Sequence, residues 1–297
     1  MLKREATQIP GKARHIPILY KKLIESVVTF KISDFFQISV NCTLRATSPL
    51  GMKNTFQLTG EYWQLMLRVF RKPEKWSIFW KQFWKESQKL VIGSLLLVFI
   101  ISIAVGGVIC LQTANNLESP FIPKFYVGVM ARESLVLEFC STMVALILAG
   151  KMGSNISSEI GSMRITEQID AMEIMGVNSA NFLILPKVTS ATIFSPLVML
   201  MSFILGVLGG GLLIAITGII TLAQYVEGLQ FAFNQWYIFY SMIKMAVFCF
   251  IITSIAAYYG YYAKGGSLGV GKSSTQAIVA SSMLILIFDL ILTKLLL

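Results

Sequence analysis

Five long apolar runs after residue 89 constrain the fold of this chain more than any other feature. A transmembrane α-helix needs about 20 mostly apolar residues, and its backbone polar groups are all hydrogen-bonded within the helix. The runs cover approximately residues 90–111, 134–150, 187–222, 236–263 and 277–297. The sequence therefore predicts an all-α membrane protein with about five transmembrane helices.

The charge distribution agrees with a membrane protein and indicates its orientation. Charged residues make up 13% of the chain, whereas a soluble domain usually carries about 25%. Residues 1–89 hold 16 Lys and Arg against 6 Asp and Glu, and residues 90–297 have no net charge. Positive charge collects on the cytoplasmic side of membrane proteins. We therefore expect a cytoplasmic N-terminus and no nucleic-acid partner.

The first 89 residues divide into two parts. Residues 1–51 show no sustained periodicity, so we expect either a poorly ordered extension or a natural start at Met52. Residues 52–89 are amphipathic, and lysines face away from a stripe of Trp76, Phe79, Trp80, Phe83 and Ser87. This pattern is typical of an interfacial helix in the headgroup plane, although a helix packed on a soluble core would also show it. Residues 90–297 then form the transmembrane domain.

Few residues are suited to catalysis or to metal binding. The only histidine is His15, and the four cysteines lack the spacing of a metal site or a redox motif. We therefore expect no catalytic residue, no metal and no cofactor. A membrane-bound enzyme would need a nucleophile or a metal cluster on one side, and no such grouping is seen.

Residues 266–273 match the phosphate-binding pattern GxxxxGK[ST]. In nucleotide-binding proteins a strand precedes this loop and a helix follows it, so that backbone N–H groups surround the phosphate. Here the pattern lies between two apolar runs near the C-terminus, with no room for a parallel sheet. We therefore expect a tight cytoplasmic turn and not a nucleotide site.

Residues 149–177 read AGKMGSNISSEIGSMRITEQIDAMEIMGV. We expect Gly150 and Gly153 to break a transmembrane helix, and Ser157 and Ser158 to precede an acidic amphipathic helix lined with Ile and Met. Because Met adapts to irregular pockets, such a helix suits docking into the groove of a partner. The alternative is a helix resting on the membrane surface, which repulsion by acidic headgroups disfavours.

This run, followed by Leu185-Pro186-Lys187, closely resembles the permease family of MlaE-type lipid transporters. The later segment LGVGKSSTQAIVASS and Asp289 resemble the last loop and helix of that family, and the similarity covers roughly residues 55–297. One departure is clear. The Arg-Glu-Leu-Gly-Pro sequence of the family's second span is here Leu-Glu-Phe-Cys-Ser at residues 137–141, so the Arg and the Gly-Pro kink are missing.

The resemblance implies that the chain is the permease subunit of an ABC transporter that moves phospholipid between the inner and outer membranes of bacteria. It also implies a multi-pass protein of the inner membrane. The implied partners are a second copy of the chain, an ATPase subunit supplied by another chain, and a periplasmic MCE-domain lipid-binding protein. The cytoplasmic helix would couple to the ATPase, and its residues at matching motif positions are Glu159, Arg164, Thr166, Glu167, Asp170 and Glu173.

Three charged residues lie inside the predicted spans, namely Glu138, Lys244 and Asp289. A charge within a bilayer costs about 2.5–3.5 kcal/mol on insertion scales and usually faces a cavity or a partner. We expect these residues to line a cavity for a lipid headgroup, and mutual pairing or snorkelling to the interface is the alternative. Buried carboxylates would also suit an ion-coupled secondary transporter of an amphipathic substrate, but such proteins usually have paired repeats and more spans.

Overall fold

The computed structural model describes residues 53–71, 75–117 and 123–296, and every regular element within these ranges is helical. The all-α prediction is therefore confirmed. Residues 58–297 form one compact unit, to which the following description applies. The expected extension at residues 1–51 lies outside the described residues.

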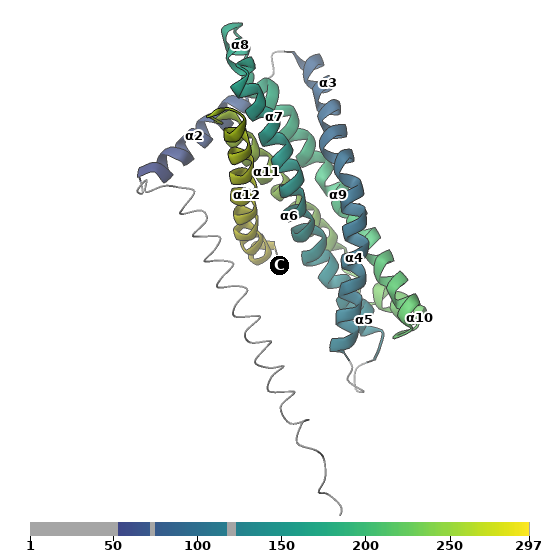
Figure 1. Ribbon diagram of the computed structural model, residues 1–297. Coiled ribbons are helices and arrows are strands. Elements are labelled where there is room, and N and C mark those ends of the chain that lie inside the picture. Colours follow the sequence, from purple (N-terminus) through teal and green to yellow (C-terminus); the bar gives the residue numbers. More distant parts are fainter. Residues whose placement is uncertain (1–52, 72–74, 118–122, 297) are drawn as a thin grey trace, which may run out of the picture. The chain divides into compact units, whose positions relative to one another are not determined.

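Among the residues that the structure describes, five helical rods are long and apolar enough to cross a membrane, as the sequence predicts (Figure 1). Most are longer than their apolar runs: α9 has 39 residues, or about 58 Å of helix, against about 30 Å of hydrocarbon. The first rod joins α3 (Trp76–Ser87), the π-helical turn η1 (Gln88–Ile92) and α4 (Gly93–Asn116). The second joins α5 (Tyr126–Ser134), η2 (Leu135–Met143), α6 (Val144–Leu148), η3 (Ala149–Gly153) and α7 (Ser154–Ile165). The others are α9 (Ser179–Thr217), α11 (Gln235–Tyr261) and α12 (Gly266–Leu296).

The α4 and α9 helices pack closely because small residues line their contact. A Cβ atom on Gly106 would lie 2.0 Å from the carbonyl oxygen of Gly206, and one on Gly209 would lie 2.3 Å from a backbone oxygen of α4. Next to this contact the hydroxyls of Ser102 and Ser202 are hydrogen-bonded at 2.8 Å. Small residues that let two helix backbones approach are a common means of association in membranes.

The rods differ in how deeply they are enclosed. In α11, 61% of the most apolar stretch is buried, and this helix packs against α7, α9 and α12. In α12, only 11% of the corresponding stretch is buried. The α11 helix is therefore the core of the unit, and α12 lies at its margin.

The amphipathic region is two helices, whereas we expected one interfacial helix through residues 52–89. The α2 helix (Lys53–Val69) lies oblique to the rods, whereas α3 runs straight into α4 (Figure 1). The aromatic face of α3 packs in part on α9, since the Phe83 and Phe194 ring centroids are 5.8 Å apart. The aromatic stripe therefore belongs to the extended end of the first rod.

The prediction that Gly150 and Gly153 break the second span is wrong. Both glycines lie in η3, and the helix continues into α7 without interruption. The break comes later, at Glu167, whose backbone is left-handed with a φ of 59°. A short helix, α8 (Gln168–Ile174), follows it. The acidic amphipathic helix predicted within residues 149–177 is therefore the end of a membrane rod joined to a separate short helix.

The GxxxxGKS segment forms the first two turns of α12, where we expected a tight turn. The turn lies at the start of the segment, where Gly265 and Gly266 have φ values of 93° and 70°. No strand precedes this segment, because the neighbouring described elements are α11 and α12. The geometry is therefore unlike that of a phosphate-binding loop.

Candidate functional site

The three charged residues predicted inside the spans meet in one group, the Lys244 cluster (Glu138, Lys244 and Asp289). The ammonium Nζ of Lys244 lies 2.5 Å from Asp289 Oδ1 and 3.1 Å from Glu138 Oε2. The Thr142 hydroxyl is within hydrogen-bond distance of both carboxylates, at 3.0 Å from Asp289 Oδ1 and 3.2 Å from Glu138 Oε2. The three charges come from η2, α11 and α12, so the cluster connects three rods.

The charges of the Lys244 cluster therefore pair with one another, which was the alternative to a lipid-lining role. The side chain of Lys244 is 0% exposed, that of Asp289 15% and that of Glu138 46%. Lys244 is enclosed because two carboxylates compensate its charge, and an uncompensated charge at this depth would be costly. Glu138 still presents about half of its side chain at the bundle surface, so a lipid-lining role remains a prediction for it.

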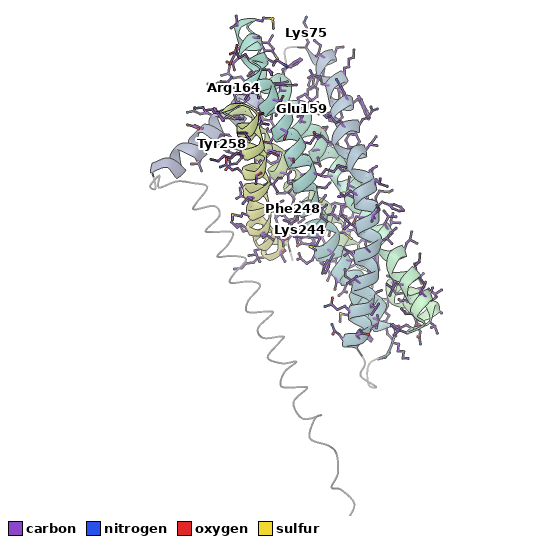
Figure 2. All side chains as sticks on the ribbon, in the orientation of Figure 1. Lys75, Glu159, Arg164, Lys244, Phe248 and Tyr258 are labelled. Atoms are coloured by element: carbon purple, nitrogen blue, oxygen red, sulfur yellow. The ribbon has the colours of Figure 1, made fainter. Side chains whose placement is uncertain are left out.

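A second buried ion group, the Lys187 network (Glu86, Lys89, Glu159 and Lys187), joins three rods nearer the α8 end. Lys187 Nζ lies 2.7 Å from Glu86 Oε2 and 2.9 Å from Glu159 Oε2, and Lys89 lies 2.8 Å from Glu159. The Lys187 side chain is only 3% exposed. Figure 2 shows Glu159 near the upper end of the bundle and Lys244 well below it.

The sequence assigns coupling to Glu159 but no role to Lys187 or Glu86. Their ion pairs connect α3, α7 and α9, which lie far apart in the chain, and no short-range pattern reveals such a pairing. The signal that the sequence did offer was Lys187 itself. This lysine stands at the start of a long uncharged stretch, and its charge therefore needs a partner.

The other predicted coupling residues surround the turn between α7 and α8. Arg164 Nη1 and Asp170 Oδ1 are 2.5 Å apart and form an ion pair across this turn. The Glu173 carboxylate accepts hydrogen bonds from the hydroxyls of Tyr261, at 2.7 Å, and of Ser179, at 3.0 Å. The Tyr261 hydrogen bond is the main reason that the pKa of Glu173 lies below its usual value. These contacts attach α8 to α9 and α11.

The outer face of α8 is open. Glu167 and Thr166 are exposed, and Ile174 and Met175 are 87% and 71% exposed. Ile169 on the inner face is fully buried. The helix lies at one end of the bundle (Figure 1) and presents acidic and apolar side chains together. We refer to Thr166, Glu167, Ile174 and Met175 as the α8 tip.

Arg132 is a buried cation that the sequence reasoning missed. Its guanidinium Nη1 donates to the carbonyl oxygens of Leu229 at 2.8 Å and of Phe231 at 2.9 Å. These carbonyls end α10 (Leu222–Gln230), and a cation there also satisfies the helix dipole. Arg132 therefore secures α10 to the second rod at the end opposite α8. Within the described ranges, no three His, Cys, Asp or Glu side chains gather as a candidate metal site.

Within the described residues, five membrane-length rods with charges paired between them are the features of a polytopic α-helical membrane protein. A family model described as "Permease MlaE" matches residues 83–295, which is most of the chain. The chain therefore belongs to the MlaE permease family, and the resemblance inferred from its sequence is confirmed.

Individual relatives agree with this family. The chain is 32% identical over 262 residues to a probable ABC transporter permease protein of Rickettsia bellii, which covers 85% of this chain and 94% of that protein. It is 29% identical over 210 residues to the intermembrane phospholipid transport system permease protein MlaE of Haemophilus influenzae, covering 70% and 80% of the two chains. The protein TRIGALACTOSYLDIACYLGLYCEROL 1 of Arabidopsis thaliana is 29% identical over 231 residues, covering 78% and 65%. The chain is thus a membrane permease of the ABC-transporter type.

Proposed function

We propose that this chain is the membrane subunit that moves phospholipid between an inner and an outer membrane, driven by ATP hydrolysis on a separate subunit. The observation that carries the proposal is the α8 tip, an exposed acidic and apolar surface at the end of a rod that crosses the whole bundle. The name of the Haemophilus influenzae relative, an intermembrane phospholipid transport permease, supports the cargo.

The second rod links the proposed ATPase contact to the membrane interior. The α7 helix is continuous with η2 through α6 and η3, so Glu159 and Glu138 lie on the same uninterrupted rod. A displacement of α8 would pass across the Glu167 turn through the Arg164–Asp170 ion pair. It would then be carried along the second rod, which contains no proline and whose π-helical segments η2 and η3 are the places where it could bend. Closure of the ATPase would thereby move Glu138 relative to Lys244 and Asp289, and so change the environment offered to a lipid.

We further propose that the active form is a homodimer, that a periplasmic MCE-domain protein exchanges lipid with it, and that the complex resides in a bacterial inner membrane. The dimer is supported by the marginal position of α12, of which little is buried within one chain. Glu138 and Asp289 are partly exposed on this side, so a second copy would enclose polar groups next to apolar walls. Such a lining suits a phospholipid, which has a charged headgroup and apolar tails.

Charge reversal at the α8 tip tests the coupling. Glu167→Lys is expected to lower the amount of co-purified ATPase about fivefold or more, because a central interface contact is typically worth more than about 1 kcal/mol. Glu227→Lys is the matched control, since Glu227 is also exposed but lies on α10 at the other end of the bundle. Each variant is co-expressed with the genes that neighbour its own, and the amount of ABC ATPase that co-purifies per permease chain is measured.

Two results would contradict the proposal. Equal recovery of the ATPase with Glu167→Lys and with wild type would remove the docking assignment. Lipid transfer by the purified chain alone, dependent on an ion gradient and independent of ATP, would instead favour the ion-coupled transporter, with the Lys244 cluster as its proton-binding group.

A further inference from the structure

A cavity of about 500 Å³ opens between the first turns of α3 and α9, at the same end of the bundle as α8. It is built from described residues on both sides of positions 72–74. Its lining combines cationic, amide and apolar side chains. These are Arg71, Lys75, Ile78, Phe79, Gln82, Gly176, Val177, Asn178, Asn181, Phe182 and Pro186.

The electrostatics of this cavity favour an anion. Arg71 and Lys75 are both exposed cations at its wall, and no carboxylate is among the described lining residues. Two long helices also begin here, and the N-terminus of each carries about half a positive charge. Neither α3 nor α9 has an acidic residue in its first turn, and Lys75, at the N-cap of α3, makes no side-chain capping bond. Among the described residues, no acidic side chain therefore caps the free N–H groups of α3.

The described part of the chain places one source of negative potential, the C-terminal end of α2, next to the cavity, and its carbonyls are hydrogen-bonded within the protein. The C-terminal carbonyls of α2 would repel an anion, but asparagine amides of α9 hold them. Asn181 Nδ2 donates to the carbonyl of Val69 at 2.7 Å and to that of Arg71 at 2.5 Å. Asn178 Nδ2 donates to a further carbonyl at 3.2 Å. These bonds also fix the backbone of Arg71 at the mouth of the cavity.

The lining also has an apolar part, which lies where a membrane interface is expected. Its members include Ile78, Phe79, Phe182 and Pro186. The same end of the first rod carries exposed tryptophans and lysines, as is typical of side chains at headgroup depth. A site with cations at one side and apolar groups at the other matches a phospholipid, and basic pockets between helices on the cytoplasmic side of membranes bind anionic headgroups.

We propose that this cavity binds the phosphate of an anionic phospholipid from the adjoining leaflet, with Arg71, Lys75 and the first turn of α3 as its ligands. The glycerol and the start of the acyl chains lie against Phe79 and Phe182. The site is separate from the Lys244 cluster, since Figure 2 shows Lys75 at the upper end of the bundle and Lys244 far below. It is thus an accessory lipid site of the permease and does not depend on which cargo is moved.

The test measures which lipid the full-length chain retains. The purified chain is exposed to equal amounts of phosphatidylglycerol and phosphatidylcholine in detergent, and the lipids that remain bound are counted by native mass spectrometry. The ratio of bound phosphatidylglycerol to phosphatidylcholine is expected to exceed one for wild type. The ratio should fall about fivefold for each cation removed in Arg71→Ala/Lys75→Ala. Lys75→Arg keeps the positive charge, so its ratio should stay close to that of wild type.

Lys81→Ala/Lys85→Ala is the matched control, because it removes two exposed cations of the same helix that do not line the cavity. An equal fall in this control would show general surface attraction and overturn the site. A preference for phosphatidylglycerol that survives Arg71→Ala/Lys75→Ala would overturn it as well. Displacement of the bound lipid by millimolar inorganic phosphate would show that the cavity takes a soluble anion, and would overturn the lipid assignment.

Discussion

Replacing Lys244 by Met removes the central charge of the Lys244 cluster at nearly constant side-chain volume. At the observed 2.5 Å from Asp289, two unit charges attract by about 7 kcal/mol with an effective dielectric constant of about 20. Desolvation of two buried ions costs several kcal/mol each and cancels most of that gain. The net contribution of the intact pair to stability is therefore small.

The variant is nevertheless expected to be strongly destabilised. Lys244→Met leaves Asp289, which is 15% exposed, without a counter-charge, and such a loss typically costs about 3–5 kcal/mol. Lys244→Met/Asp289→Asn removes both charges of the pair and should recover most of this loss. Glu138→Gln should cost less than about 1 kcal/mol, because solvent screens a side chain that is 46% exposed.

The assay is denaturant unfolding of the purified chain in detergent, followed by tryptophan fluorescence, for wild type and the three variants. The expected order of stability is wild type and Glu138→Gln first, then the double variant, then Lys244→Met. If Lys244→Met unfolds at the same denaturant concentration as wild type, or if adding Asp289→Asn lowers stability further, the charge-compensation reasoning is refuted.

Three further predictions follow from the packing and the polar contacts. Gly106→Ala should lower the free energy of unfolding by about 1–3 kcal/mol, because the added Cβ meets a backbone oxygen at 2.0 Å, whereas Gly93→Ala, where the Cβ meets nothing within 4 Å, should not. Arg132→Met should cost about 1.5–3 kcal/mol and speed hydrogen exchange in α10, and unchanged exchange would contradict its capping role. The Tyr261 hydroxyl lowers the pKa of Glu173. The ionised Glu173 carboxylate therefore stabilises α8 fully at pH values above the usual pKa of a glutamate, and this stabilisation is lost as the pH falls through the lowered pKa. Tyr261→Phe should raise the pKa of Glu173 towards its usual value, which a pH titration of protease cleavage at α8 would detect as a midpoint at higher pH.

The number of spans was predictable from the sequence, and their boundaries were not. Apolar composition shows where a helix crosses hydrocarbon, but the second rod and α12 also cover several turns of polar sequence, at residues 151–165 and 266–276, where periodicity marks no clear boundary. Glycine was a misleading signal at residues 150 and 153, since neighbouring rods hold the helix together there. The actual break at Glu167 needs a left-handed residue, which sequence alone rarely locates.

The sequence predicted the three charged members of the Lys244 cluster, and it offered their mutual pairing only as the alternative to a lipid cavity. Glu138, Lys244 and Asp289 stand out because charges are rare in apolar runs, and they do come together. The Lys187 network depends on contacts between rods that are distant in sequence, so nothing local identifies Glu86 as a partner. Arg132 was missed because it lies just before an apolar run, where a charge is ordinarily solvated.

The Lys187 network has a mechanical consequence for the transport cycle. If the third rod slid by one helical turn, about 5.4 Å, against the first and second rods, Lys187 would lose both of its carboxylate partners. Its charge would then be buried without compensation. We therefore expect the first, second and third rods to travel as a single block. The Lys244 cluster links α12 to the second rod and to α11 in the same way, so any displacement of α12 from this block has to break or exchange those ion pairs.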